Sequence, residues 1–217
     1  MGATRTVDLA LLEPFVAPGV FTRIDPAVEA LLAPLPELHD RVLGCVEFCY
    51  TLHAGRTIDY AAGGGSGVPG ADELIERRKY LRAALAEYAA MDDAALIDFA
   101  NLSGRSAPRM VSSPDPRIHV VRLLRHANIH LSATRLSHAA RGAVWDGPVG
   151  RQEFEYFMIL ADNLSSSIRA TREAKRYDSA DLTAMLDWLD AEQREWGIDH
   201  LVLRCAELHA KVVAAAV

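Results

Sequence analysis

Five side chains able to bind anions or move protons lie within one nine-residue stretch of the chain, residues 122–130. They are Arg122, Arg125, His126, Asn128 and His130. An arginine guanidinium binds phosphate and stabilises negative charge, and a histidine with a pKa of about 6.5 exchanges a proton near neutral pH. The stretch therefore predicts either a site for an anionic ligand or a polar layer between packed helices.

The stretch lies in a segment with helical periodicity, so residues three or four apart share one face. His119, Arg122, His126 and His130 fall on one such face and form a predicted polar stripe. The neighbouring face is apolar and carries Val120, Leu123, Leu124, Ala127 and Leu131. This division is what a helix shows when one side packs in the core and the other meets polar groups.

Metal binding is one chemistry open to the stripe, because His126 and His130 have the spacing of the histidine pair in helical zinc sites. Metalloproteases with that pair carry a glutamate after the first histidine, whereas this chain has Ala127. The sequence also contains no Glu-x-x-His, the pattern of carboxylate-bridged di-iron bundles. We predict no metal and no other cofactor, and keep a histidine-based metal or small-ligand site as an alternative.

The segment from Arg125 to His130 resembles the Arg-x(4–6)-His signature of the HEPN superfamily, in which a polar residue commonly follows the arginine. The resemblance covers this motif and an all-helical architecture. It implies a metal-independent endoribonuclease, or a non-catalytic nucleotide or RNA binder, that is frequently dimeric. Arg125 would then stabilise charge on the phosphate, and His130 would take the proton from a ribose 2′-hydroxyl. The supporting polar shell would be His119, Arg122, His126 and Asn128.

The helical spacing constrains such a site. Five residues turn a helix by roughly 140°, so Arg125 and His130 do not point the same way from one straight helix. A composite site across a two-fold axis would bring them together, which predicts a homodimer with its interface near this helix. A second Arg-x4-His, from Arg204 to His209, lacks the polar residue after the arginine.

Two non-catalytic interpretations stay open. In the first, His126, Asn128 and His130 form a structural seam of hydrogen bonds between the helices of an interaction or regulatory protein. In the second, residues 182–208 form a helix-turn-helix, although its second helix has one arginine before Lys211 and two acids. A plain helical hairpin fits that segment better, and we do not expect double-stranded DNA as a partner.

Capping residues and apolar spacing predict the elements that position the stretch. Asp115 followed by Pro116 opens the helix that carries it. The predicted helices cover about 26–55 with a break at Pro34 and Pro36, 72–91, 92–102, 116–136, 152–177, 178–196 and 199–217. Residues 137–145 fit either a helix end or an extended segment. No β-alternation of useful length appears, so we predict an all-α, antiparallel helical bundle of about five to seven helices.

The domain organisation follows from the same reading. Residues 1–25 contain two prolines and two glycines among short apolar runs and predict an irregular N-terminal arm. Residues 26–217 predict a single helical-bundle domain. Its glycine-rich segment, residues 61–70, predicts a flexible loop, because no Lys-Ser or Lys-Thr pair follows to complete a phosphate-binding loop.

Composition narrows the function classes. The chain has 217 residues, 50% of them hydrophobic and 24% charged, with a formal net charge of −6. This acidic balance argues against a protein that coats nucleic acid, but permits a local basic pocket for RNA or a nucleotide. Three cysteines without a CxxC pair indicate reduced thiols, and no apolar run is long enough to cross a bilayer. We therefore expect a cytoplasmic protein with no membrane association.

Overall fold

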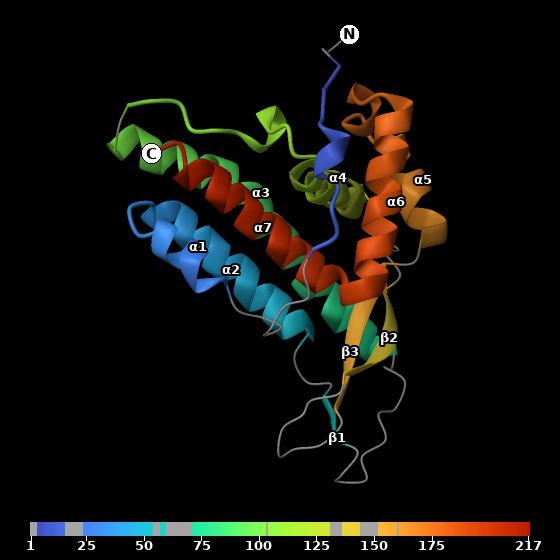
Figure 1. Ribbon diagram of the computed structural model, residues 1–217. Coiled ribbons are helices and arrows are strands. Elements are labelled where there is room, and N and C mark those ends of the chain that lie inside the picture. The colour runs from blue at the N-terminus through green and yellow to red at the C-terminus, as the bar shows by residue number, and fades with distance from the viewer. Residues whose placement is uncertain are drawn as a thin grey trace.

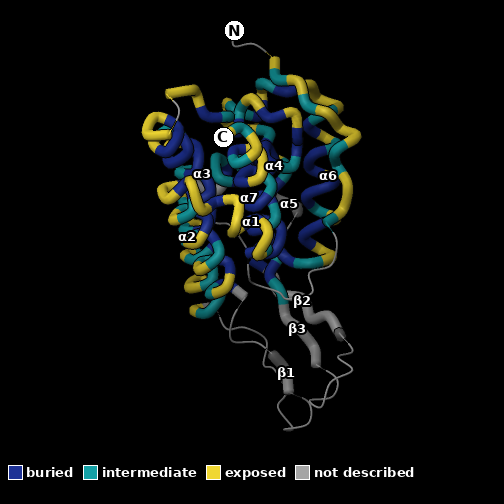
Figure 2. The backbone as a smooth tube through the Cα atoms, turned by 60° about the vertical axis from the view of Figure 1, so that its left-hand side comes forward, coloured by how far each residue is buried: buried dark blue, intermediate teal, exposed yellow. Residues whose placement is uncertain are grey.

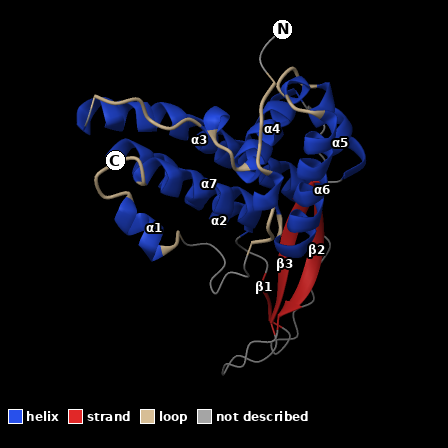
Figure 3. Ribbon diagram, turned by 45° about the horizontal axis from the view of Figure 1, so that its top comes forward, coloured by secondary structure: helices blue, strands red, loops and turns tan. Residues whose placement is uncertain are grey.

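The structure is a computed structural model that describes residues 4–15, 24–53, 57–59, 71–102, 104–130, 136–143, 152–159 and 161–217. The helices within these ranges are α1 (Pro26–Leu31), α2 (Pro36–His53), α3 (Ala71–Leu102), α4 (Pro116–His130), α5 (Ala161–Ala170), α6 (Ser179–Trp196) and α7 (Ile198–Ala214). The strands are β1 (Thr57–Asp59), β2 (Leu136–Ala143) and β3 (Gln152–Ile159). The predicted all-α class is confirmed, with one small sheet added at one end of the helical bundle (Figure 3).

Helix α7 forms the centre of the bundle. It runs between α2 and α3 in Figure 1 and also packs against α1, α4 and α6. Leu201, Val202, Cys205, Ala206 and Val213 on α7 are all fully buried. In Figure 2 the exposed residues of α2 and α6 lie on the outer sides of the bundle. A helix covered by its neighbours in this way is not available to read a DNA groove, so residues 182–208 form a plain helical hairpin.

The predicted helix starts at Asp25, Asp115 and Asp178 are confirmed. Each carboxylate accepts a hydrogen bond from the amide two residues further on and so satisfies one unpaired donor of the first helical turn. The donors are the amides of Ala27 (2.9 Å), Arg117 (3.0 Å) and Ala180 (2.7 Å).

The turn between α6 and α7 requires a glycine. Gly197 has a φ of 90°, in the region that side-chain-bearing residues rarely adopt. A Cβ atom there would lie 2.6 Å from Asp199 Oδ1 and 2.9 Å from the Cβ of Tyr156. The predicted helix boundary at Trp196 and Gly197 is therefore confirmed, and its cause is the close approach of strand β3 and the start of α7.

The predicted break near Met91 is wrong, because α3 runs without interruption from Ala71 to Leu102. No glycine or proline interrupts this range. Asp92, the first residue of the predicted second helix, directs its buried carboxylate out of α3 to the amide of Met110 at 2.8 Å. A side chain satisfied by another segment leaves the backbone of its own helix undisturbed.

The predicted helix over residues 152–177 is wrong for its first part, which is strand β3. Residues 136–143, of which the sequence placed Leu136 in the preceding helix and left 137–143 open, form β2 and pair antiparallel with β3, with Leu136 opposite Ile159. Strand β1 pairs on the other edge of β3, giving the order β1-β3-β2. Phe157 and Ile159 alternate into the core, and the side-chain amide of Gln193 bonds both backbone groups of Ile159. Strand pairing is a contact between separate segments, so the periodicity of residues 152–159 alone could not reveal it.

The N-terminal arm crosses the bundle between α4 and α6 (Figure 1). Its described residues contain one short 3-10 turn, Leu9–Leu11, and an isolated β-bridge from Arg5 to Tyr177, and are otherwise irregular. The amide of Phe15 donates to Glu192 Oε1 at 3.1 Å, and the amide of Asp8 donates to the carbonyl of Pro114 at 2.9 Å. The predicted glycine-rich loop at 61–70 lies outside the described residues. Within the described part of the chain, no helix combines the length and apolarity needed to cross a membrane.

Candidate functional site

Helix α4 divides into the two faces expected from its periodicity. The apolar residues Val120, Leu123, Leu124 and Ala127 are buried in the core. The described side chains of the polar stripe, those of His119, Arg122 and His126, all face the segment 171–177 that follows α5. The stripe is thus a lengthwise contact between α4 and one irregular segment.

His119 forms the buried end of the stripe. Its Nε2 lies 2.8 Å from the carbonyl oxygen of Ser113 and its Nδ1 lies 2.6 Å from the hydroxyl of Tyr177. A carbonyl only accepts, so Nε2 carries the proton and Nδ1 accepts from the tyrosine. Burial lowers the pKa of His119, which keeps the ring neutral and agrees with this tautomer. Both ring nitrogens of His119 are therefore hydrogen-bonded within the protein.

The N-terminal arm adds Arg5 to the same cluster. Its Nη1 donates to the Tyr177 hydroxyl at 3.0 Å, and its guanidinium lies 5.6 Å from the centre of the tyrosine ring. Its backbone amide donates to the carbonyl of Arg176 at 2.7 Å. Burial raises the pKa of Tyr177, so the phenol stays protonated and links Arg5 to His119. The link fixes an arginine from the start of the chain beside α4.

Glu173 is the carboxylate that three arginines share. Its Oε1 pairs with Nη2 of Arg5 and lies 3.7 Å from Nε of Arg122. Its Oε2 lies 3.9 Å from Nη1 of Arg176. The Nε atoms of Arg122 and Arg176 are buried and make no hydrogen bond to any described residue. One carboxylate cannot satisfy three guanidinium groups, each of which has five N–H donors.

Asp92 holds Arg122 from the opposite side. Its Oδ2 lies 3.5 Å from Nη1 of Arg122 and 3.8 Å from Nε of Arg109. Its Oδ1 lies 3.5 Å from Nε2 of His209 on α7. The carboxylate of Asp92 is almost fully buried, so it connects the polar face of α4 to the centre of the bundle.

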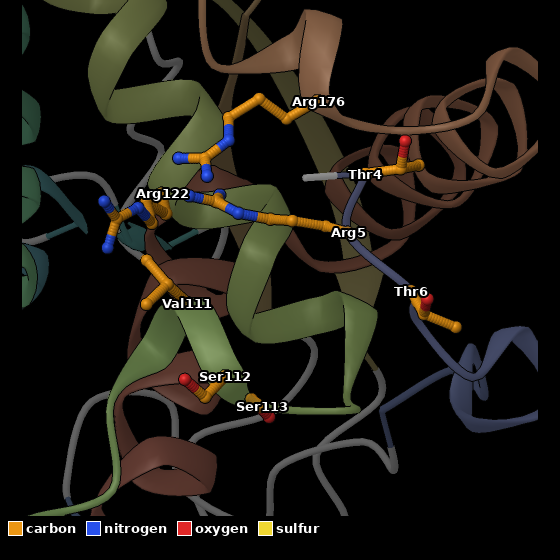
Figure 4. A pocket seen from close by; sticks show the side chains of 8 residues that line it. All are labelled: Thr4, Arg5, Thr6, Val111, Ser112, Ser113, Arg122 and Arg176. Atoms are coloured by element: carbon orange, nitrogen blue, oxygen red, sulfur yellow. The ribbon is translucent and has the colours of Figure 1, made fainter. Parts of the chain in front are cut away.

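The three arginines line one cavity of about 380 Å³, here called the arginine cavity. In Figure 4 the side chains of Arg5, from the arm, and Arg176, from the turn before α6, extend toward each other, while the guanidinium of Arg122, from α4, points away from them. The wall between them is hydroxyl-rich and contains no carboxylate. The lining residues are Thr4, Arg5, Thr6, Val111, Ser112, Ser113, Arg122 and Arg176.

A second cavity, of about 430 Å³, lies beside His126 and is here called the His126 cavity. It is lined by His126, Ala170, Thr171, Arg172 and Glu173. Burial lowers the pKa of His126, and the nearby arginines lower it further against the opposing effect of Glu173. The ring is therefore neutral at pH 7, and it makes no hydrogen bond to any described residue.

The structure describes the side chain of only one member of the predicted catalytic pair, Arg125. Arg125 is half-buried, its Nε makes no hydrogen bond to any described residue, and it lines neither cavity. Asn128 and His130 belong to α4, but their side chains lie outside the described part of the structure. The composite site of Arg125 and His130 therefore stays a prediction.

Four residues of the cluster escaped the sequence-based prediction: Arg5, Glu173, Arg176 and Tyr177. Arg176 belongs to a basic run, residues 169–176, that charge–dipole complementarity at a helix end explains without a ligand. Arg5 stands in an irregular arm with no periodicity to orient it. A signal was present only in the basic run, because the contacts that gather these residues span the whole chain.

No group of three or more His, Cys, Asp or Glu side chains among the described residues is arranged to hold a metal ion. The side chain of His130, the second member of the predicted histidine pair, lies outside the described part of the structure. Comparison of the chain with protein-family models, curated proteins and solved structures returned no match.

Proposed function

We propose that the protein binds a phosphate-bearing ligand, a nucleotide or single-stranded RNA, in the arginine cavity. The observation that carries this proposal is the presence of Arg5, Arg122 and Arg176 in the lining of one cavity. Guanidinium groups match the geometry of phosphate oxygens and bind them through paired, charge-assisted hydrogen bonds.

The arrangement of charges supports an anionic ligand. Glu173 and Asp92 neutralise part of the cluster, but the buried Nε donors of Arg122 and Arg176 remain without a described partner. The hydroxyls of Thr4, Thr6 and Ser112 offer further donors around the same space.

The test is a calorimetric titration of the full-length protein with inorganic phosphate and with a nucleoside monophosphate. We expect Arg176→Gln to weaken both affinities about tenfold, the loss of one charge-assisted hydrogen bond at a partly exposed site. Lys175→Gln is the matched control, because it removes the same charge from an exposed neighbour that does not line the cavity. Equal affinities in the two variants, or no binding by the unaltered protein, would contradict the proposal.

A second candidate function is the metal-independent RNA cleavage that the HEPN resemblance implies. Arg125 supports it, because its guanidinium is held half-buried on α4 with Nε unengaged by any described residue. His130 would act as the base and Arg125 would stabilise the transition state, with His119, Arg122, His126 and Asn128 as the polar shell.

Incubation with single-stranded RNA in a chelator tests cleavage directly. We expect His130→Ala to abolish it and His39→Ala, a change on α2 that touches neither cavity, to leave it intact. A protein that cleaves no RNA, or cleaves equally well without His130, would leave the non-enzymatic interaction or regulatory protein. The buried seam from Arg5 through Tyr177 to His119 supports that alternative.

The HEPN-like reaction also requires a homodimer with its interface near α4, which light scattering of the purified protein tests.

We propose a cytoplasmic location on the grounds that Cys45, Cys49 and Cys205 are buried and unpaired, as suits a reducing compartment.

A further inference from the structure

The His126 cavity has no part in phosphate binding by the three arginines, yet it adjoins their cluster. Glu173 adjoins both spaces: it pairs with Arg5, Arg122 and Arg176, which line the arginine cavity, and it lines the cavity beside His126. A ligand anchored on the arginines therefore has this second space next to it.

The spacing of Arg122 and His126 suits a ligand of the size of one phosphorylated sugar. Arg122 and His126 are four residues apart on α4, so they share a face and lie about 6 Å apart along the helix axis. A phosphate and the ring hydroxyls of the sugar that carries it are separated by a comparable length. One phosphorylated sugar can therefore reach both residues without moving the helix.

The lining of the His126 cavity selects hydroxyl groups. Its two charged lining residues, Arg172 and Glu173, are opposite in sign and offset each other, so this cavity does not attract a second phosphate as the arginine cavity does. The hydroxyl of Thr171 is already used, since it donates to the carbonyl of Ile168 at 2.7 Å and accepts from the amide of Ala174 at 3.1 Å. The neutral His126 ring keeps one donor and one acceptor for a ligand.

We propose that the two cavities together hold a phosphorylated sugar with a free vicinal diol, its phosphate on Arg5, Arg122 and Arg176 and its hydroxyls on His126 and Glu173. The inference rests on the proposed phosphate binding and adds the class of ligand to it. Ribose phosphate supplies this chemistry either as a free sugar phosphate or within a ribonucleotide. His126 then acts as the residue that distinguishes ribose from sugars that lack the hydroxyls.

Four ligands separate the contributions in titrations of the full-length protein: inorganic phosphate, ribose 5-phosphate, a ribonucleoside 5′-monophosphate and its 2′,3′-dideoxy analogue. We expect the ribonucleotide to bind about tenfold more tightly than the dideoxy analogue, the contribution of one or two hydrogen bonds. His126→Ala should remove this difference and leave the affinity for inorganic phosphate unchanged. His126→Gln, which keeps a donor and an acceptor, should restore part of it.

The outcomes distinguish the inference from the function beneath it. Phosphate binding with no preference for the ribonucleotide, or a preference that survives in His126→Ala, would overturn the inference and leave the proposed function standing. Failure of every ligand, inorganic phosphate included, would overturn both. A preference for the ribonucleotide that depends on His126 supports the inference. If ribose 5-phosphate then binds as tightly as the ribonucleotide, the ligand is a free sugar phosphate; if it binds more weakly, the ligand is a nucleotide. Unchanged phosphate affinity also shows that His126→Ala is folded.

Discussion

Helices α4 and α7 each carry an Arg-x4-His pattern, from Arg125 to His130 and from Arg204 to His209. On α7 the side chains of this pattern pair with neighbouring residues. Nη1 of Arg204 pairs with Glu207 at 2.5 Å, and its Nε donates to Nε2 of His200 at 3.1 Å. His209 is fully buried beside Asp92. Because Arg204 is already paired and His209 is buried, these side chains are not available to a ligand.

On α4 the polar face meets cavities. Arg122 lines one space and His126 lines another, because the elements opposite them are an irregular arm and a turn rather than a packed helix. Both helices thus carry an Arg-x4-His pattern, but on α4 the residues that line cavities are its neighbours Arg122 and His126, four residues apart. The difference teaches that the neighbours of a helix decide whether a polar pattern forms a site or a seam.

The largest effect on this comparison is expected at Asp92, whose carboxylate lies close to Arg122 on α4 and to His209 on α7. We expect Asp92→Ala to lower the free energy of unfolding by about 4 kcal/mol, because it leaves cationic partners and the Met110 amide without a buried acceptor. Asp93→Ala is the control, since that side chain is 81% exposed and should change stability by less than about 0.5 kcal/mol. Urea unfolding measures both, and similar losses would show that Asp92 joins nothing essential.

The pH dependence of stability tests whether His209 on α7 is buried in its neutral form. Burial lowers the pKa of His209 from 6.5 to about 4. Between these values the unfolded chain binds the proton and the folded protein does not, so stability is complete above pH 6.5 and falls as the pH drops toward 4. The shift corresponds to about 3 kcal/mol. We expect His209→Gln to lose less stability than the unaltered protein between pH 7 and 4.5 in urea unfolding, and parallel losses would count against a buried neutral His209.

The smallest expected effect lies on the open side, at Glu173. Its carboxylate occupies the arginines that a phosphate would use, so Glu173→Gln should tighten the binding of inorganic phosphate by roughly three- to tenfold at low salt. Asp187→Asn, an equal change of charge at an exposed residue of α6, should leave the affinity unaltered. Weaker binding in Glu173→Gln would mean instead that the carboxylate holds the arginines in position.

Much of the helical framework could be predicted from local signals. The caps at Asp25, Asp115 and Asp178, the break at Gly197 and the buried face of α4 all follow from residues within one or two turns of each other. The all-α class follows because most segments carry helical periodicity. The polar stripe was also visible, since three of its members lie on one face and meet one segment.

What could not be predicted depends on contacts between separate segments. Residues 152–159 carry apolar groups at spacings that fit a helix, but they pair with residues 136–143 and 57–59 as a strand. The carboxylate of Asp92 accepts from the Met110 amide, a partner that no spacing within its own helix indicates. Arg5 gains a role only because Tyr177 lies beside it, although 172 residues separate them in the chain.

The sequence by itself determined the helix starts, the apolar faces and the presence of a polar stripe on α4, because capping and periodicity act between near neighbours. The tertiary structure alone decided which polar groups face solvent-filled cavities and which are closed in the core. It did so by placing an irregular arm and the turn at residues 171–177 against α4, and by surrounding α7 with helices. Solvent access is a property of the packed assembly of elements, and no spacing within one helix encodes it.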